Sequence, residues 1–355
     1  MRALIEVIDG GIGNSIQDRG RLGFRHMGIT VSGWIDPMLA RCANALVGNE
    51  ADCACIEIRG AGPTLVAREG RFRVVLTGDV SALLTKENGA TREVPAWTSF
   101  TLEANDTLEV GYIAGGTAYL AVGGGIDTPL QLGSRSTYQR ALIGGVDGRP
   151  LATGNRLAAK PIRDPKFQEY RAEPWLHDEG PIRVVLGPQE DHFDPASVKA
   201  FVENEYQVTT QLDRMGVRLE GQALAHVSKA AADIVSDGVT PGSIQVPGNG
   251  QPIVLLADCQ TVGGYPKIAT VISADLPRLA QARLVGQRLL DRFRRVQLVA
   301  LGRLLQFVEQ MGRRLDAAVA GQQQGFQFLE QFVIDLAARE DGLQLAAPLD
   351  RKSVV

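Results

Sequence analysis

The sequence predicts a mainly β protein with short helices and a helical C-terminal extension. Glycine accounts for 40 of the 355 residues, well above average usage, and this excess favours turn-rich β structure. Short apolar or alternating runs separated by Gly, Asn and Asp fill residues 1–160, as expected of an antiparallel fold rather than of βαβ units. Sustained helical periodicity dominates only beyond residue 297.

Residues 1–160 form the first predicted β unit, with runs such as "RALIEVID", "FRVVLTG", "SALLT" and "DTLEVGYI". One helix interrupts it at "DPMLARCANALVG". Asp36 is its expected N-cap, Pro37 its first-turn residue and Gly48 its C-terminal stop.

Residues 161–180 are rich in proline and charge without periodicity, which predicts a connecting strap. A second β unit follows over residues 181–296. It contains one predicted helix, "DPASVKAFVENEY", with Asp194 and Pro195 at its start. Residues 297–355 carry apolar residues at helical spacing and are expected to form amphipathic helices that dock on the body or on another chain.

Composition limits the function classes. Hydrophobic residues make up 45%, charged residues 22%, and the net charge is −3, so neither nucleic acid nor an anionic membrane is expected as a partner. The N-terminus lacks the features of a signal peptide, and no apolar run reaches the roughly 20 residues of a membrane span. Four cysteines without metal-ligand spacing predict free thiols in the cytoplasm and no metal site.

Several catalytic motifs are missing from the sequence. It contains no G-x-x-x-x-G-K-[ST] phosphate loop, no H-E-x-x-H and no G-x-S-x-G. Its four histidines are scattered, and a lone histidine is more often structural or solvated than catalytic.

Four stretches nevertheless combine many polar groups with glycines. They are residues 13–37, residues 131–155, "LGPQEDHF" with "TTQLDRMGVRLEG", and residues 243–277 with "DCQTVGGYPKIA" at their centre. Together with "IQDRGRLG", "GSRSTY", "DRMGVRL" and "PGSIQVPGNGQPI", these motifs resemble the biotin-dependent carboxyltransferase-like family over about residues 5–293. That family includes the C subunit of 5-oxoprolinase, the KipA proteins, "allophanate hydrolase subunit 2" and the carboxyltransferase domain of urea carboxylase.

The resemblance implies two cyclophilin-like β-barrel units that act beside a subunit-B or KipI-like partner. With a third, lactam-utilisation-type subunit, such proteins form an ATP-dependent 5-oxoprolinase, which opens 5-oxoproline to glutamate. This is the expected function, with ATP used by the complex and not held firmly by this chain. Two alternatives stay open: a carboxyltransferase component that passes carboxybiotin's carboxyl group to urea or a related amide, and a KipA-type regulator that binds a kinase inhibitor.

These reactions share the task of activating an amide or ureido carbonyl, which needs donors held against a developing oxyanion. Glycine permits close approach and positive φ, so the N–H groups of Gly263 and Gly264 are candidate donors. The other candidates are grouped by chemistry: Asp258, Asp191 and Asp213 as proton acceptors, Arg135, Arg214 and Lys267 as anion-binding cations, Gln189, Gln245 and Gln260 for amide recognition, Tyr138 and Tyr265 for ring stacking with an O–H donor, and Ser134 and Thr261 as binding residues.

Each candidate has a structural alternative. Asp213 and Arg214 are equally readable as a structural ion pair, and Ser134 to Ser136 as loop caps. The pairs Gly144–Gly145 and Gly263–Gly264 can each be interpreted as tight turns, and this interpretation is favoured for Gly144–Gly145. Asp18, Arg19 and Arg21 are readable as a solvated face.

The sequence departs from the family pattern at Cys259 and Val262, where the family commonly has an arginine-like residue and a threonine. No histidine neighbours Cys259 to lower its pKa, so it is not expected to be a nucleophile. Beyond about residue 300 the family normally ends soon after a short helix, so the resemblance does not explain the longer helical extension.

Overall fold

A computed structural model describes residues 3–113, 116–159, 169–175, 177, 180–281 and 291–295. Residues 1–296 belong to one compact unit. The predicted helices of residues 297–355 and much of the predicted strap lie outside the described residues.

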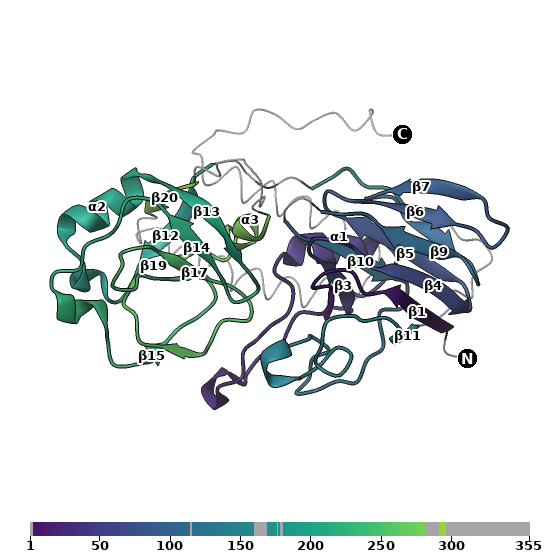
Figure 1. Cartoon of the computed structure of the whole chain (residues 1–355), viewed down its shortest axis with the longest axis horizontal. Coiled ribbons are helices and arrows are strands. Elements are labelled where there is room, and N and C mark those ends of the chain that lie inside the picture. Colours follow the sequence, from purple (N-terminus) through teal and green to yellow (C-terminus); the bar gives the residue numbers. More distant parts are fainter. Residues whose placement is uncertain are drawn as a thin grey trace, which may run out of the picture. The chain divides into compact units, whose positions relative to one another are not determined.

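The first half consists of two antiparallel sheets (Figure 1). The first has the order β11-β1-β4-β9-β6-β7, formed by Arg156–Ala159, Ala3–Asp9, Thr64–Glu69, Thr107–Val110, Ser81–Thr85 and Thr91–Pro95. The second has the order β2-β3-β10-β5-β8, formed by Ser15–Gln17, Cys55–Ile58, Ala118–Val122, Phe72–Thr77 and Phe100–Leu102. Alternation along each strand directs one set of side chains from both sheets into a common core.

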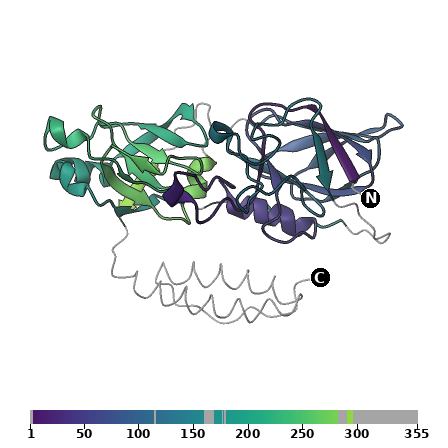
Figure 2. The same ribbon diagram turned by 90° about the horizontal axis from the view of Figure 1, so that it is seen from below.

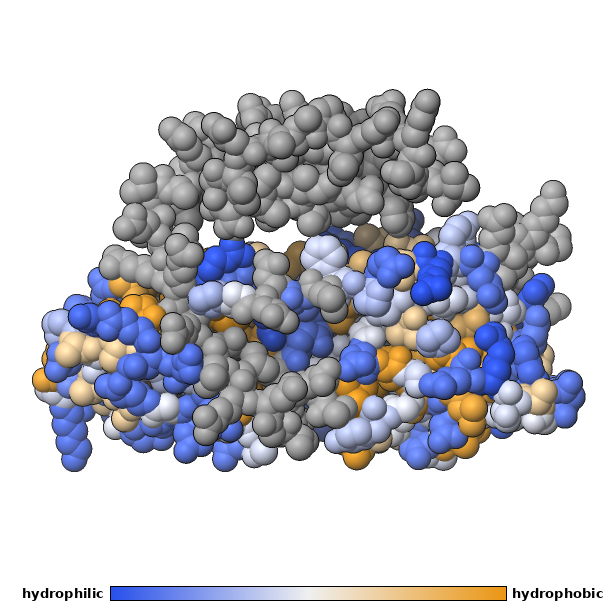
Figure 3. All heavy atoms as spheres, turned by 90° about the horizontal axis from the view of Figure 1, so that it is seen from above, coloured by the Kyte–Doolittle hydropathy of each residue, from blue (hydrophilic) through white to orange (hydrophobic). Residues whose placement is uncertain are grey.

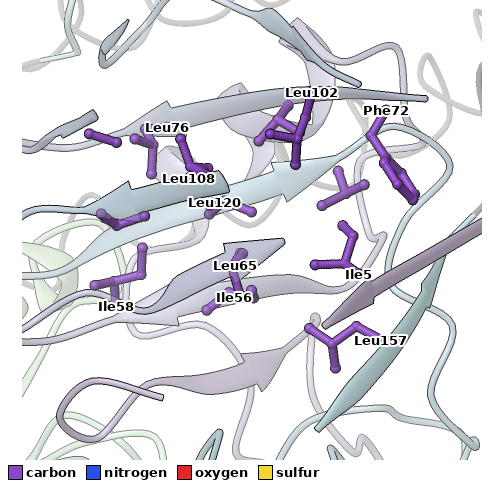
Figure 4. Close-up of a cluster of buried hydrophobic side chains, with 14 of the residues drawn as sticks. Ile5, Ile56, Ile58, Leu65, Phe72, Leu76, Leu102, Leu108, Leu120 and Leu157 are labelled. Atoms are coloured by element: carbon purple, nitrogen blue, oxygen red, sulfur yellow. The ribbon is translucent and has the colours of Figure 1, made fainter. Parts of the chain in front are cut away.

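This core is drawn in Figure 4. Ile5 and Leu65 come from the first sheet, and Ile56, Leu76 and Leu120 from the second; all are at most 1% exposed. The second sheet is buried on its other face as well, where it packs on α1 (Pro37–Leu46).

Both predicted helix starts are confirmed. The Asp36 carboxylate accepts hydrogen bonds from Met38 N and Leu39 N, each at 3.2 Å, at the start of α1. Asp194 accepts from Ala196 N at 2.9 Å at the start of α2 (Pro195–Glu203). In both helices proline occupies the first turn, where no N–H is needed.

The strands of the second half close into a barrel of order β12-β19-β16-β17-β14-β13-β20. They span Ile182–Leu186, Lys267–Val271, Ser243–Gln245, Ile253–Leu255, Gly216–Glu220, Glu205–Leu212 and Asp291–Arg295. The parallel pairing of β12 with β20 closes the ring. Around its apolar interior lie the remaining short elements: α3 (Leu276–Ala280), the two-stranded ribbon β15 (Asp237–Gly238) and β18 (Val262–Gly263), and the 3-10 turns η3 (Glu190–His192) and η4 (Lys229–Ala232).

The mainly β class with short helices is therefore confirmed. Among the described strands, hydrogen bonding closes a barrel in the second half alone, since those of the first half separate into two sheets. We propose that the two cores correspond to the two predicted β units. Of the strap, Tyr170 O accepts from Ser99 N at 2.8 Å and Ala172 N donates to Trp97 O at 3.0 Å, so this part runs along the first half.

The described surface carries both hydrophilic and hydrophobic side chains, as one face shows in Figure 3. Several large apolar side chains are more than half exposed in the polar loops, including Leu22, Met27, Leu130, Leu142 and Val262. No helix within the described ranges is long and apolar enough to cross a membrane.

Candidate functional site

The first two polar stretches meet at Asp18. Its carboxylate is buried and accepts from Ser134 Oγ and Ser136 Oγ at 2.6 Å each, from Gly20 N at 2.8 Å and from Arg135 N at 2.6 Å. Four donors satisfy the two oxygens of this buried anion. Ser134 Oγ also accepts from Ser136 N at 3.0 Å, which is the loop-capping contact that the structural alternative described.

Arg21 lies beside Asp18 and is fully buried. Its guanidinium donates to Gln131 O at 3.2 Å and to Ser136 O. Burial lowers the pKa of Arg21, while Asp18 and then Asp258 act in the opposite direction. The alternative of a solvated face is therefore wrong for Asp18 and Arg21, because partners more than 100 residues away cover these polar groups, whereas Arg19 is exposed.

Gly144 allows this packing. Its φ is +71°, and a Cβ there would lie 2.0 Å from Ser136 O. Only glycine fits so close a backbone approach in the left-handed region. The Gly144–Gly145 pair thus has a structural role at the junction of the two polar stretches.

Arg214 is the centre of what we call the Arg214 cluster, with Glu57, Tyr119 and Asp258. Its guanidinium makes a bidentate pair with Asp258, Nε–Oδ2 at 2.9 Å and Nη2–Oδ1 at 3.0 Å. It also donates to Glu57 Oε1 and, at 2.7 Å, to Gly33 O. Burial alone would lower the pKa of Arg214, but Asp258 and Glu57 outweigh it and raise the pKa well above its ordinary value.

A buried network continues from Glu57. Tyr119 Oη donates to Glu57 Oε2 at 2.7 Å and accepts from Asp36 N at 2.9 Å. The Asp36 carboxylate also contacts His177 Nε2 at 2.7 Å and accepts from Gln281 Nε2 at 2.8 Å. Burial, followed by Glu57 and Asp36, raises the pKa of Tyr119, so its phenol stays a donor. Asp36 therefore caps α1 and also connects it to His177 and Gln281.

Residues of the first polar stretch also hold the chain just before and within "DCQTVGG". Ser32 N and Thr30 Oγ1 donate to Ala257 O at 3.1 and 3.0 Å. Arg25, in η1 (Arg25–Met27), donates to Val239 O and to Gln260 O. In Figure 2 the dark purple segment containing η1 reaches the green strands of the second half, in agreement with these bonds.

The second group of polar side chains, the Lys267 cluster, comprises Gln189, Asp237, Gln245, Gln260 and Lys267. The pairing of β16 with β19 shifts between Ile244–Ala269 and Gln245–Lys267, which is a bulge. A bulge redirects side chains, and such irregularities are common next to functional sites. Here it accompanies a lysine that is 4% exposed in the wall of a barrel.

Lys267 Nζ donates to Asp237 Oδ2 at 2.5 Å and to Gly238 O at 2.8 Å. The hydrogen bond from Lys267, followed by that from Gly238 N, lowers the pKa of Asp237. Gln189 joins the pair from both sides: Nε2 donates to Asp237 Oδ2 at 3.3 Å, and Oε1 accepts from Lys267 N at 3.2 Å.

The two other glutamines form a chain of amides beside Gly263. Gln260 Nε2 donates to Gln245 Oε1 at 3.2 Å, and Gln245 Nε2 donates to Tyr265 O at 3.3 Å. A Cβ on Gly263 would lie 2.5 Å from Gln245 Nε2, so a larger residue at this position would displace the Gln245 amide. Neither Gly263 nor Gly264 has a positive φ. Gly263 lies in β18, which pairs with β15, and Gly264 follows the strand in a bend.

The remaining predicted residues take other positions. Asp213 accepts from Met215 N at 2.7 Å and Gly216 N at 3.1 Å, so it caps its own turn. Of the two interpretations left open for Asp213 and Arg214, the structural ion pair is not found, because Arg214 pairs with Glu57 and Asp258. Arg135 pairs with Asp127 at 3.0 Å and donates to Thr128 O. Asp191 is exposed in η3, and Thr261 is half-buried with its carbonyl bound to Val239 N.

Two tyrosines flank the loop. Tyr265 is 42% exposed and so presents its ring at the surface. Tyr138 is half-buried, and burial followed by Asp258 raises its pKa. Cys259 is fully buried, and burial raises its pKa despite the nearby Arg25. This agrees with its expected lack of nucleophilic character.

Sequence reasoning missed Glu57, Asp237 and Arg25. The signal for Glu57 was a lone acid inside the apolar run "CIEI", since a charge in a strand buried on both faces needs a partner. Asp237 and Arg25 stand in polar stretches without a distinguishing pattern. Within the described residues, no group of three or more His, Cys, Asp or Glu side chains could hold a metal ion.

The arrangement offers two kinds of chemistry. The Arg214 cluster is a charge-paired assembly with its donors and acceptors engaged, which suits it to hold the loop in place. The Lys267 cluster combines an ammonium with neighbouring amide groups, which can bind carbonyl or carboxylate oxygens.

Several known proteins are similar to this chain in sequence and in fold. Residues 27–290 match the family described as "Carboxyltransferase domain, subdomain A and B". The chain is 40% identical over 286 residues to the C subunit of 5-oxoprolinase from Escherichia coli K12, covering 79% of this chain and 88% of that protein. It is 30% identical over 302 residues to urea amidolyase of Saccharomyces cerevisiae, covering 79% of this chain but 16% of that protein.

Solved structures agree with these matches. The structure of TTHA0988 superposes with a TM-score of 0.70 at 31% identity, covering 83% of this chain and 56% of that one. The structure of Kluyveromyces lactis urea amidolyase gives a TM-score of 0.71 at 27% identity, covering 83% of this chain and 19% of that one. The chain therefore belongs to the carboxyltransferase family, subdomains A and B.

Proposed function

We propose that this chain is a subunit of an ATP-dependent 5-oxoprolinase complex that opens 5-oxoproline to glutamate. One observation carries the proposal: the chain matches 88% of a protein named as the C subunit of 5-oxoprolinase, at 40% identity. The match to urea amidolyase covers a small fraction of a much larger enzyme. A role as one subunit among several therefore fits the match to the C subunit of 5-oxoprolinase better than the match to urea amidolyase.

The Lys267 cluster suits the substrate of this reaction. 5-Oxoproline is a flat cyclic amide with a carboxylate, so its recognition needs donors for the lactam oxygen and the carboxylate and an acceptor for the ring N–H. The Lys267 ammonium can supply a donor, and the Gln245 and Gln260 amides supply both donor and acceptor groups. Tyr265, exposed beside them, offers a ring for stacking and an O–H donor.

The Arg214 cluster then acts as the support of the site. Both oxygens of Asp258 are engaged by Arg214, so we assign Asp258 and Arg214 to positioning rather than to proton transfer or substrate binding. Asp258 begins the stretch that leads to Gln260, Gly263 and Lys267, so fixing its carboxylate fixes the start of the loop.

Partner subunits complete the proposal. The sequence has no G-x-x-x-x-G-K-[ST] motif, so we place ATP use on a subunit-B or KipI-like protein and a third, lactam-utilisation-type subunit, all in the cytoplasm. Activity of this chain is expected only in that complex.

The test is reconstitution. The chain is purified with its co-encoded candidate partners, and glutamate release from 5-oxoproline is measured with and without ATP and with each subunit omitted. We expect release only with ATP and all subunits. Absence of release from the full, folded mixture contradicts the proposal.

The family match favours one second candidate, a carboxyltransferase component that uses carboxybiotin. In that case added biotin carboxylase and biotin carrier proteins should support bicarbonate fixation on urea or a related amide. Avidin should then abolish activity, whereas a 5-oxoprolinase should be insensitive to avidin.

A further inference from the structure

A short surface segment, residues 233–239, lies over the ammonium of Lys267; we call it the covering segment. Ile234 N donates to Gly264 O at 2.9 Å, and Val239 N donates to Thr261 O at 3.1 Å. Between these anchors, β15 pairs with β18. The segment is therefore held at both ends by the polar loop itself, while Val235 is 93% exposed to solvent.

Lys267 depends on this segment for its charge balance. A buried ammonium is costly unless a carboxylate and further acceptors compensate for lost water. Among the described residues, Asp237 is the carboxylate that pairs with Lys267, and Gly238 provides the second acceptor. Both acceptors come from consecutive residues of the covering segment.

The geometry limits what Lys267 can offer to a ligand. An ammonium has three N–H donors, and the contacts to Asp237 and Gly238 use two of them. One donor is left, and its direction is set by the other two. Gln189 fixes the carboxylate in turn, because it binds Asp237 Oδ2 and the Lys267 backbone at once.

We propose that Asp237 is a positioning residue, which holds Lys267 so that a single N–H is presented to a carbonyl or carboxylate oxygen of the substrate. The assignment of Lys267 to the substrate site rests on the proposed function. The restraint of Lys267 by Asp237 does not, and it can be measured on the isolated chain.

The first experiment measures amine reactivity. The folded chain is treated with limiting acetic anhydride, and acetylation of each lysine is followed by peptide mass spectrometry. Lys199, whose side chain is 73% exposed, serves as the internal reference. We expect Lys267 to react at least tenfold more slowly than Lys199 in the unmodified chain.

The variants are Asp237→Ala and the matched control Asp233→Ala, an exposed acid in the same segment. We expect Asp237→Ala to raise the rate at Lys267 at least fivefold and Asp233→Ala to leave it unchanged. Asp237→Asn, which keeps the side-chain shape, replaces Asp237→Ala if the latter does not fold. Equal rates in the unmodified chain and the Asp237 variant overturn the proposal.

The second experiment uses the reconstituted complex. We expect Asp237→Ala to lower kcat for 5-oxoproline opening at least tenfold and Asp237→Glu to recover part of the loss, whereas Asp233→Ala retains full activity. A kcat for Asp237→Ala equal to that of the unmodified complex also overturns the positioning role. If no complex opens 5-oxoproline, the proposed function fails, and the acetylation rates still decide whether Asp237 restrains Lys267.

Discussion

Arg214 and Lys267 are both largely buried cations, with side chains 13% and 5% exposed, yet their partners differ in kind. Arg214 is held by two buried carboxylates, Glu57 and Asp258, and by a backbone carbonyl. Lys267 has one carboxylate partner, Asp237, whose side chain is 52% exposed, and one carbonyl.

This difference separates the structural role of Arg214 from the proposed substrate-binding role of Lys267. A guanidinium whose donors are divided between two buried anions has little left for a ligand, and its removal leaves both anions uncompensated. An ammonium with one donor left and a solvated counter-ion can exchange a ligand at small cost to the fold. The two cations should therefore respond in opposite ways to substitution.

The largest effect is expected for Arg214→Met. It removes the cation that is paired with the buried carboxylates of Glu57 and Asp258, which should lower the free energy of unfolding by about 3–5 kcal/mol. Urea unfolding followed by circular dichroism measures the loss. Arg218→Met, an exposed change on β14, is the control and should stay within about 0.5 kcal/mol. If Arg214→Met lowered the free energy of unfolding as little as Arg218→Met does, the structural role assigned to Arg214 would be wrong.

The local part of this architecture follows from the sequence. Asp36 and Asp194 were predictable as caps because the N–H groups that they bind lie two or three residues away. The alternation of short strands and turns is also a property of neighbouring residues, and it predicted the mainly β class. The pairing of strands into two sheets and one barrel depends on contacts between distant segments.

The candidate site was predicted as a set of loops but not as pairs of residues. Asp18 finds its serines 116 and 118 residues along the chain, and Arg214 finds Glu57 at a separation of 157. Polar residues that look solvated in the sequence are thus buried by distant partners. An ion pair between Arg214 and its neighbour Asp213 was one of the two interpretations left open, yet the Asp213 carboxylate caps its own turn.

The second largest effect is expected for Lys267→Met, on activity rather than on stability. Removing one preorganised donor should lower kcat of the reconstituted complex about 100-fold. Because Asp237 is half exposed and regains water, the free energy of unfolding should fall by less than about 1 kcal/mol. Lys199→Met on α2 is the control for both measurements. A folded Lys267→Met complex with full activity would remove Lys267 from the site.

A smaller effect tests how far the support behind Arg214 extends. Asp36→Ala removes the cap of α1 and the contacts with His177 and Gln281, so we expect a loss of about 2 kcal/mol in unfolding free energy. Asp194→Ala removes an exposed cap of α2 and should cost about 1 kcal/mol. Equal losses for the two variants would show that the contacts beyond the cap add no stability.

The smallest effect is expected for Cys259→Ser, which lies between the two clusters. Burial raises the pKa of this thiol, with Arg25 opposing the shift, so little thiolate exists near neutral pH. We expect the variant to keep activity within about twofold, because thiol and hydroxyl differ little in size. Iodoacetamide should alkylate Cys259 at least tenfold more slowly in the folded chain than in the unfolded chain at pH 8.

The raised pKa of Cys259 fixes the sign of its contribution to the pH dependence of stability. The folded chain keeps the Cys259 proton at a pH where the unfolded chain, with a thiol pKa of about 8.5, has begun to lose it. The contribution of this thiol to stability is therefore complete below about pH 8.5 and declines above it, a decline that Cys259→Ser should remove. If Cys259→Ser folds but is inactive, the chemistry extends into the segment that joins Asp258 to Gln260, and support and chemistry can no longer be assigned to separate clusters.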